Sequence, residues 1–144
     1  MNIAATISSH INDAYKVLSH PITRAEYILT LNGSPCSSED HPNMDPDFLS
    51  DIMDINEDLD SLADLMKTTD NVDILSHSFD KVKQDISTRW DNSMNSLKLC
   101  IEQASWDAAH QALSQLRYFE RLKARLRELV PALSSKNVKI PSNL

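Results

Sequence analysis

The sequence predicts an all-α protein, and three observations lead to that prediction. Only one glycine occurs in 144 residues, whereas phosphate-binding loops, dinucleotide-binding turns and type I′ hairpins require glycine. Apolar residues recur every three or four positions over most of the chain, as they do in amphipathic helices. Proline and helix-capping residues stand where these apolar patterns begin and end.

Two short helices are expected in residues 1–33. The first ends at His20, because the residue before Pro21 is driven out of the α region, and the second runs from Pro21 to Asn32-Gly33. The apolar stripe of the first helix comprises Ile3, Ile7, Ile11, Ala14 and Leu18, with Tyr15 beside it. Two short helices cannot bury this stripe between themselves, so either an upstream segment is missing or the stripe docks on the rest of the protein.

Residues 34–44 collect Pro, Ser, Asp and Asn without periodicity, which predicts a linker and a domain boundary. Three long helices follow in residues 45–133: one starts at Pro46 with Asp45 as its cap, one follows the polar break 67–71, and one is capped by Ser105. Their stripes are Phe48, Ile52, Ile55, Leu59, Leu62 and Met66; Leu75, Phe79, Val82, Ile86, Trp90, Met94, Leu97 and Ile101; and Trp106, Ala109, Leu113, Leu116, Phe119, Leu122, Leu126 and Leu129. Three long helices joined by short turns predict an antiparallel bundle. Pro131 is expected to end the last helix, and 134–144 to form a flexible tail.

Composition excludes several classes of function. Fourteen basic against 21 acidic residues give a net charge of −7, which argues against non-specific nucleic-acid binding. No apolar run approaches the roughly 20 residues that cross a bilayer, and the N-terminus reads neither as a secretory signal nor as a mitochondrial presequence. Cys36 and Cys100 are expected to be free thiols, although spacing alone leaves a disulfide open.

The sequence favours neither an enzyme nor a metal or cofactor site. The five histidines are scattered: His10, His20, His41, His77 and His110. The best local cluster, Glu39-Asp40-His41, lies in the linker, where a solvated loop is the expected state. A nucleophile elbow is excluded because no glycine flanks a serine in the required pattern.

Two apolar residues leave the core stripe of the helix that starts at Pro46. Taking Phe48 as zero and a turn of about 100° per residue, Leu49 and Met53 lie at about 100° and 140°. The opposite flank of the helix is acidic, with Asp47, Asp51, Asp54 and Asp58. Two interpretations remain: Leu49 and Met53 belong to a wide core face, or they form an exposed apolar patch.

Tyr118, on the last long helix, is a third residue that lies off the stripe of its helix. It points about 160° away from the first residues of its helix's stripe. Because the stripe rotates along the helix, Tyr118 either rejoins a packed face or anchors an interface through its large ring and polar tip.

Three segments resemble a known family. INDAYKVLSHPITRAEYILTLNG (residues 11–33) is similar to the end of the J-domain in HscB (Jac-type) co-chaperones of iron–sulfur cluster assembly. DPDFLSDIMDINEDL (45–59) and WDAAHQALSQLRYFERL (106–122) resemble the opening and the last helix of that family's C-terminal three-helix domain. These motifs follow in family order over nearly all of residues 3–130 and are most similar to mitochondrial members.

The resemblance implies a fold and separate functions for its two domains. The fold would be J-domain helices III and IV followed by the three-helix bundle. In the family the J-domain stimulates ATP hydrolysis by a DnaK-type chaperone, and the bundle binds the cluster scaffold protein. The scaffold-binding positions fall on Leu49, Met53 and Tyr118, which we call the apolar patch. Phe48, Asp51, Asp54 and Asp58 are its implied neighbours, although Asp51 replaces a basic residue of some members.

The chain also departs from the family. A J-domain works through a His-Pro-Asp loop before helix III, but the only His-Pro pairs here are His20-Pro21 and His41-Pro42, neither followed by Asp. No chaperone-binding residue carries over, and we expect no ATPase stimulation. The sequence is expected to be an incomplete form rather than a true short form. The cysteine zinc module of some animal relatives is absent as well.

Partners and compartment follow from the resemblance. It implies a cluster scaffold protein, with a DnaK-type chaperone engaged only if the missing loop is supplied, and a place in the mitochondrial matrix, with the cytoplasm as the alternative. The rival interpretation is a scaffold-binding or self-associating helical adaptor without chaperone activity. In that case the unpaired stripe of the first helix would drive homodimerisation.

Overall fold

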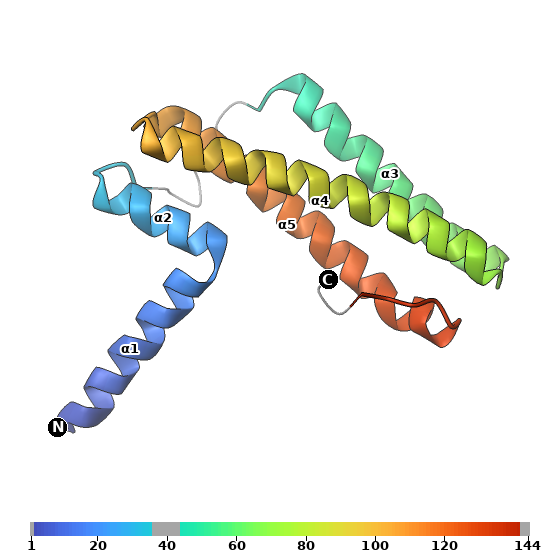
Figure 1. Ribbon diagram of the computed structural model, residues 1–144, viewed down its shortest axis with the longest axis horizontal. Helices are drawn as coiled ribbons and strands as arrows, with labels where there is room; N and C mark the ends of the chain where they lie inside the picture. Colours follow the sequence, from blue (N-terminus) through green and yellow to red (C-terminus); the bar gives the residue numbers. More distant parts are fainter. Residues whose placement is uncertain (1, 36–43, 142–144) are drawn as a thin grey trace.

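The computed structural model describes residues 2–35 and 44–141, and these residues form five α-helices and no strand (Figure 1). The helices are α1 (Ile3–Ser19), α2 (Pro21–Leu31), α3 (Pro46–Thr68), α4 (Val72–Glu102) and α5 (Trp106–Ser135). The all-α prediction is confirmed. Most of the predicted linker lies outside the described residues, and so do Cys36 and the Glu39-Asp40-His41 cluster.

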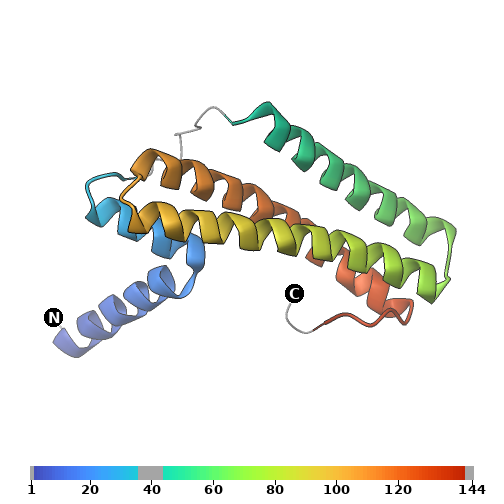
Figure 2. The same cartoon turned by 45° about the horizontal axis from the view of Figure 1, so that its top comes forward.

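The three long helices pack along one another as a bundle (Figure 2). Phe48 of α3 contacts Tyr118 of α5, Asn56 contacts Arg125, and Met66 contacts Lys136, so the two helices run parallel. α4 lies between them in the sequence and runs antiparallel to both, which gives an up-down-up order. Every predicted stripe residue of α3 is buried in the core shared with α4 and α5.

Three helices end in the same backbone motif. After α2, α4 and α5 the chain turns through a left-handed residue, namely Gly33 (φ 75°), Ala104 (φ 54°) and Asn137 (φ 65°). In each case the next N–H bonds back to a carbonyl in the last turn, for example from Ser105 to Cys100 at 2.9 Å. This is the Schellman motif, in which glycine is the preferred left-handed residue.

α5 continues through Pro131, so the prediction that this proline ends the helix is wrong. Proline removes one backbone donor, but the extra turn buries Leu133 and allows Val138 to pack into the same core. Within the segment predicted to be a flexible tail, Val138 is buried in the core. Lys136 donates to the backbone carbonyl of Met66 and bonds the Asp70 carboxylate at 2.8 Å, which fixes the tail to the end of α3.

α2 packs on the bundle and forms a second core with one end of α4 and α5. The buried residues of this core are Ile22, Ala25, Leu29, Leu97, Ala109, Ala112, Leu113 and Leu116. An ion pair between Glu26 and Arg117 of α5, at 2.7 Å, lies beside this core. α2 therefore precedes the predicted linker in sequence but belongs to the bundle by its packing.

α1 extends away from the bundle (Figure 1) and, among the described helices, contacts only α2. None of its residues is buried, and Ile3 and Ile11 remain 71% and 63% exposed. Docking of the α1 stripe on the bundle, one of the two expected outcomes, is therefore wrong. None of the described helices combines the length and the apolar character needed to span a membrane.

Candidate functional site

The start of α3 presents two large apolar side chains to solvent. Leu49 is 39% exposed and Met53 is 64% exposed, whereas the adjacent Phe48 and Ile52 are buried in the core. Their spacing of four residues places Leu49 and Met53 one above the other on the helix surface. The wide-core interpretation is wrong for both residues.

Tyr118 lies at the seam between α3 and α5, half-buried beside the first core. Its ring meets Phe48 edge to face with centroids 5.8 Å apart, and the Arg121 guanidinium lies 5.2 Å from its centroid. Tyr118 therefore packs on the core through one side while its remaining surface stays accessible. Of the two alternatives from the sequence, the structure shows the packed face, and the interface role stays a prediction.

Leu49 and Met53 lie on the α5 side of α3. Asn56 and Asp60 are at the same helical angles as Leu49 and Met53, to within about 20°, and both bond Arg125 of α5. Arg125 is seven residues beyond Tyr118 and therefore shares its face of α5. The fold thus gathers the three members of the apolar patch along one seam.

The acidic flank of α3 faces α4 instead. Arg89 of α4 bonds Asp51 at 2.8 Å and Asp85 at 2.9 Å. The hydrogen bonds to Asp85 and then to Asp51 raise the pKa of the Arg89 guanidinium. Asp54 follows Asp51 by three residues and therefore shares this flank. Of the predicted neighbours of the patch, Asp54 lies away from Tyr118, and Asp51 is engaged with α4.

Phe48 supports the patch from below. Its side chain is only 9% exposed, and besides Tyr118 it meets Phe119 with centroids 5.5 Å apart. An aromatic ring packed between two others holds Tyr118 in position. Phe48, which the resemblance implies as a neighbour of the scaffold-binding positions, therefore lies in the core beneath Tyr118.

No metal centre is found in the part of the chain that the structure describes: no three His, Cys, Asp or Glu side chains there are grouped as ligands. His20 accepts a hydrogen bond from the Ile22 N–H through Nδ1, at 3.3 Å, and its Nε2 lies 2.8 Å from the Glu120 carboxylate. Both ring nitrogens are therefore used to fix the corner between α1 and α2. Cys100 is a half-buried free thiol at the end of α4.

Comparison with known proteins gives consistent matches. Residues 44–127, which include α3, α4 and most of α5, match the family described as the HSCB C-terminal oligomerisation domain. The J-type co-chaperone jac1, mitochondrial, of Schizosaccharomyces pombe is 32% identical over 127 residues, which are 88% of this chain and 52% of the relative. The chain thus spans about half the length of this curated relative.

A solved structure matches over a longer part of the chain than the family does. The chaperone HscB from Vibrio cholerae superposes with a TM-score of 0.75 at 25% sequence identity, over 91% of this chain and 72% of that chain. Because the match extends beyond residues 44–127, it includes part of the α1–α2 region. A J-domain fragment followed by a three-helix bundle fits this likeness.

Proposed function

The chain belongs to the HscB family of J-type co-chaperones, and from this premise we propose that it acts as a co-chaperone in iron–sulfur cluster biogenesis. The relative from Schizosaccharomyces pombe is named as a mitochondrial co-chaperone, which supports the mitochondrial matrix as the compartment, with the cytoplasm as the alternative. In this role the chain binds and presents another protein and is not itself catalytic.

The proposed partner of the bundle is the cluster scaffold protein, and the proposed contact is the apolar patch of Leu49, Met53 and Tyr118. The observation that carries this assignment is Met53, which is 64% exposed directly after the buried Ile52. Solvent-exposed apolar side chains beside a half-buried tyrosine have the character of interface anchors. Phe48 positions the tyrosine, and the acidic flank with Asp54 forms a polar rim on the α4 side.

The test is the triple substitution Leu49→Ala, Met53→Ala and Tyr118→Ala, with binding to the scaffold protein measured by isothermal titration calorimetry. Each anchor contributes about 1–3 kcal/mol, so the triple variant should lose detectable binding while circular dichroism stays helical. A matched control is Ile74→Ala with Leu99→Ala, because these residues of α4 are also exposed and apolar. Wild-type affinity in the triple variant would refute the assignment.

Delivery of the scaffold to a DnaK-type chaperone is the second part of the proposal. The His-Pro-Asp tripeptide does not occur in these 144 residues, so they contain no candidate for the ATPase-stimulating loop. We therefore expect this chain to bind the scaffold without accelerating ATP turnover by the partner chaperone. Steady-state ATP hydrolysis with and without the chain measures this, and normal stimulation would contradict it.

Self-association is a second candidate, favoured by the exposed stripe of α1. Ile3, Ile7 and Ile11 stand on one face of a helix that has no buried residue. Sedimentation velocity over a range of concentrations should show dimers that Ile7→Lys abolishes. A monomer at all concentrations would eliminate this candidate and leave the scaffold assignment untouched.

A further inference from the structure

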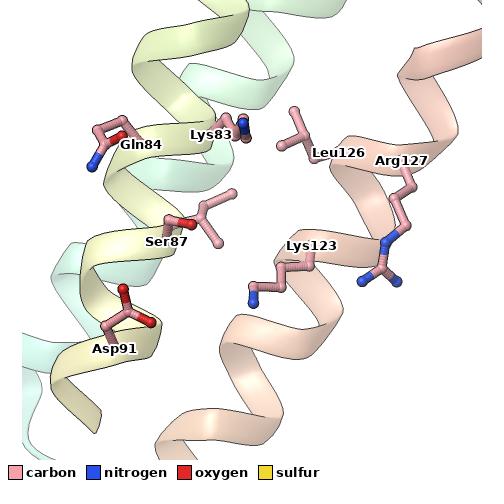
Figure 3. A pocket seen from close by; sticks show the side chains of 8 residues that line it. Lys83, Gln84, Ser87, Asp91, Lys123, Leu126 and Arg127 are labelled. Atoms are coloured by element: carbon pink, nitrogen blue, oxygen red, sulfur yellow. The ribbon is translucent and has the colours of Figure 1, made fainter. Parts of the chain in front are cut away.

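The seam between α4 and α5, on the side away from α3, contains a groove of about 380 Å³. Its polar lining is Lys83, Gln84, Ser87 and Asp91 from α4 and Lys123 and Arg127 from α5 (Figure 3). We call this the basic groove. Two fully buried side chains, Ile86 and Leu126, contribute its apolar lining.

The basic groove differs from the other two seams in how its charges are arranged. Between α3 and α4, Arg89 pairs with Asp51, and between α3 and α5, Arg125 pairs with Asp60. In both seams a cation on one helix therefore faces a carboxylate on the other.

The basic groove carries cations on both walls and one carboxylate, that of Asp91 on α4. Lys83 stands on α4, while Lys123 and Arg127 stand on α5 (Figure 3). No carboxylate within the described residues lies in ion-pair contact with any of the three. A chain of net charge −7 thus places three positive charges and one negative charge, that of Asp91, around one hollow.

The contacts and the lowered pKa of Lys123 illustrate the environment inside the basic groove. The Lys123 ammonium lies 3.8 Å from the centroid of the Trp90 ring of α4, a cation–π contact. Burial, followed by the charge of Arg127, lowers the pKa of Lys123, while Asp91 and Glu120 act in the opposite direction. A partly desolvated ammonium beside a guanidinium is well placed to bind an anion.

We propose that the basic groove binds a phosphate-bearing ligand, that is, a compact oxyanion with at least two negative charges. Cations on opposite walls favour an anion that fits between them, and the hydroxyl of Ser87 adds a neutral hydrogen-bond donor. Asp91 lies at one end of the groove, where it would repel an extended acidic chain running along the seam (Figure 3). The observations therefore favour a compact phosphate group over an acidic peptide.

The test is a titration of the ¹⁵N-labelled full chain with pyrophosphate at low salt, followed by amide chemical shifts. We expect shifts centred on residues 83–91 and 123–127, and at least a tenfold weaker dissociation constant in the variant Lys83→Gln with Arg127→Gln. The charge-matched control is Lys81→Gln with Lys98→Gln, whose lysines are exposed on α4 and do not line the groove. ATP and inorganic phosphate, as separate arms, distinguish a nucleotide from a free phosphate as the source.

Two further readouts decide between a binding site and a structural role. Without ligand, the Lys83→Gln with Arg127→Gln variant should melt at a higher temperature than the wild type, because it removes repulsion between like charges. Pyrophosphate should also raise the pKa of Lys123, measured by ¹³C NMR of its ε-carbon. The proposal is overturned if the wild type shows no shifts, if the control variant weakens binding equally, or if hexaglutamate binds the same residues more tightly than pyrophosphate.

Discussion

The rings of Phe48 and Tyr118 meet edge to face, with centroids 5.8 Å apart and planes inclined by 75°. This contact joins the first turn of α3 to the middle of α5. It also links a surface residue of the apolar patch to a buried core residue, so the patch is held in place by the same packing that holds the bundle together.

Phe48→Ala should lower the free energy of unfolding by about 3–5 kcal/mol, because it removes a buried ring and leaves a cavity under Tyr118. Phe48→Leu should lower it much less, since it keeps most of the volume and loses mainly the two ring contacts, each worth about 0.5–1.5 kcal/mol. Urea unfolding followed by circular dichroism measures both. Equal losses in the two variants would show that the cavity under Tyr118 is not the cause.

Ile52 and Met53 are adjacent in sequence, yet substitution should affect stability at only one of them. Ile52→Ala should lower the free energy of unfolding by about 2–4 kcal/mol, because Ile52 is buried in the core. Met53→Ala should change it by less than about 0.5 kcal/mol, because Met53 is largely exposed. Chemical denaturation of the two single variants provides the comparison. A large loss at Met53 would place it in the core and remove the basis for the apolar patch.

Gly33 and Ala104 both have left-handed backbone, so glycine should be more stable than alanine at each of the two positions. Ala104→Gly should raise the free energy of unfolding by about 0.5–1 kcal/mol, because it relieves a left-handed conformation that is strained for alanine. Gly33→Ala should lower it by about 1 kcal/mol through backbone strain alone, since no atom lies within 4 Å of the added Cβ. Thermal unfolding measures both. A destabilised Ala104→Gly variant would contradict the argument.

Protonation of the Asp70 carboxylate should contribute to the loss of folding stability in acid. Its hydrogen bond to Lys136, and then the charge of that lysine, lower the pKa of Asp70 below its ordinary 3.8. Because the folded-state pKa is lowered, the contribution is complete above the unfolded pKa and is lost as the pH falls through the folded value. The difference in unfolding free energy between wild type and Asp70→Asn should therefore be largest at neutral pH and shrink below pH 3.8.

Urea unfolding at several pH values tests this prediction. Because Asp70 is exposed, added salt should reduce the difference. Asp73→Asn is a suitable control, since that exposed carboxylate has no ion-pair partner among the described residues. A difference between wild type and Asp70→Asn that persists in strong acid would contradict the Asp70–Lys136 link.

The sequence predicts the five helices well because their determinants are local. Spacing of apolar residues identifies the buried face of α3, and Pro21 and Pro46 mark two of the helix starts. Local signals do not predict where α5 ends, near the C-terminus. Pro131 is a helix breaker by its own chemistry, and only burial of Leu133 and Val138 against distant helices explains why α5 continues.

The site was predictable in part for the same reason. Helical rotation identifies Leu49 and Met53 as off-stripe residues, and the structure exposes both. The pairing of Tyr118 with Phe48 depends on the parallel register of α3 and α5, which no local pattern encodes. The basic groove was missed because Lys83 and Arg127 are 44 positions apart and only the packing of α4 on α5 makes them neighbours. The signal in the sequence is the presence of cations beside the apolar stripes of two successive helices.

The packing of α2 has a mechanical consequence. Ile22, Ala25 and Leu29 pack in the second core, and His20 pairs with Glu120 of α5, so α2 sets the direction in which α1 leaves the bundle. A partner that binds the exposed Ile3, Ile7 and Ile11 would therefore be positioned relative to Leu49 and Met53 through α2 alone.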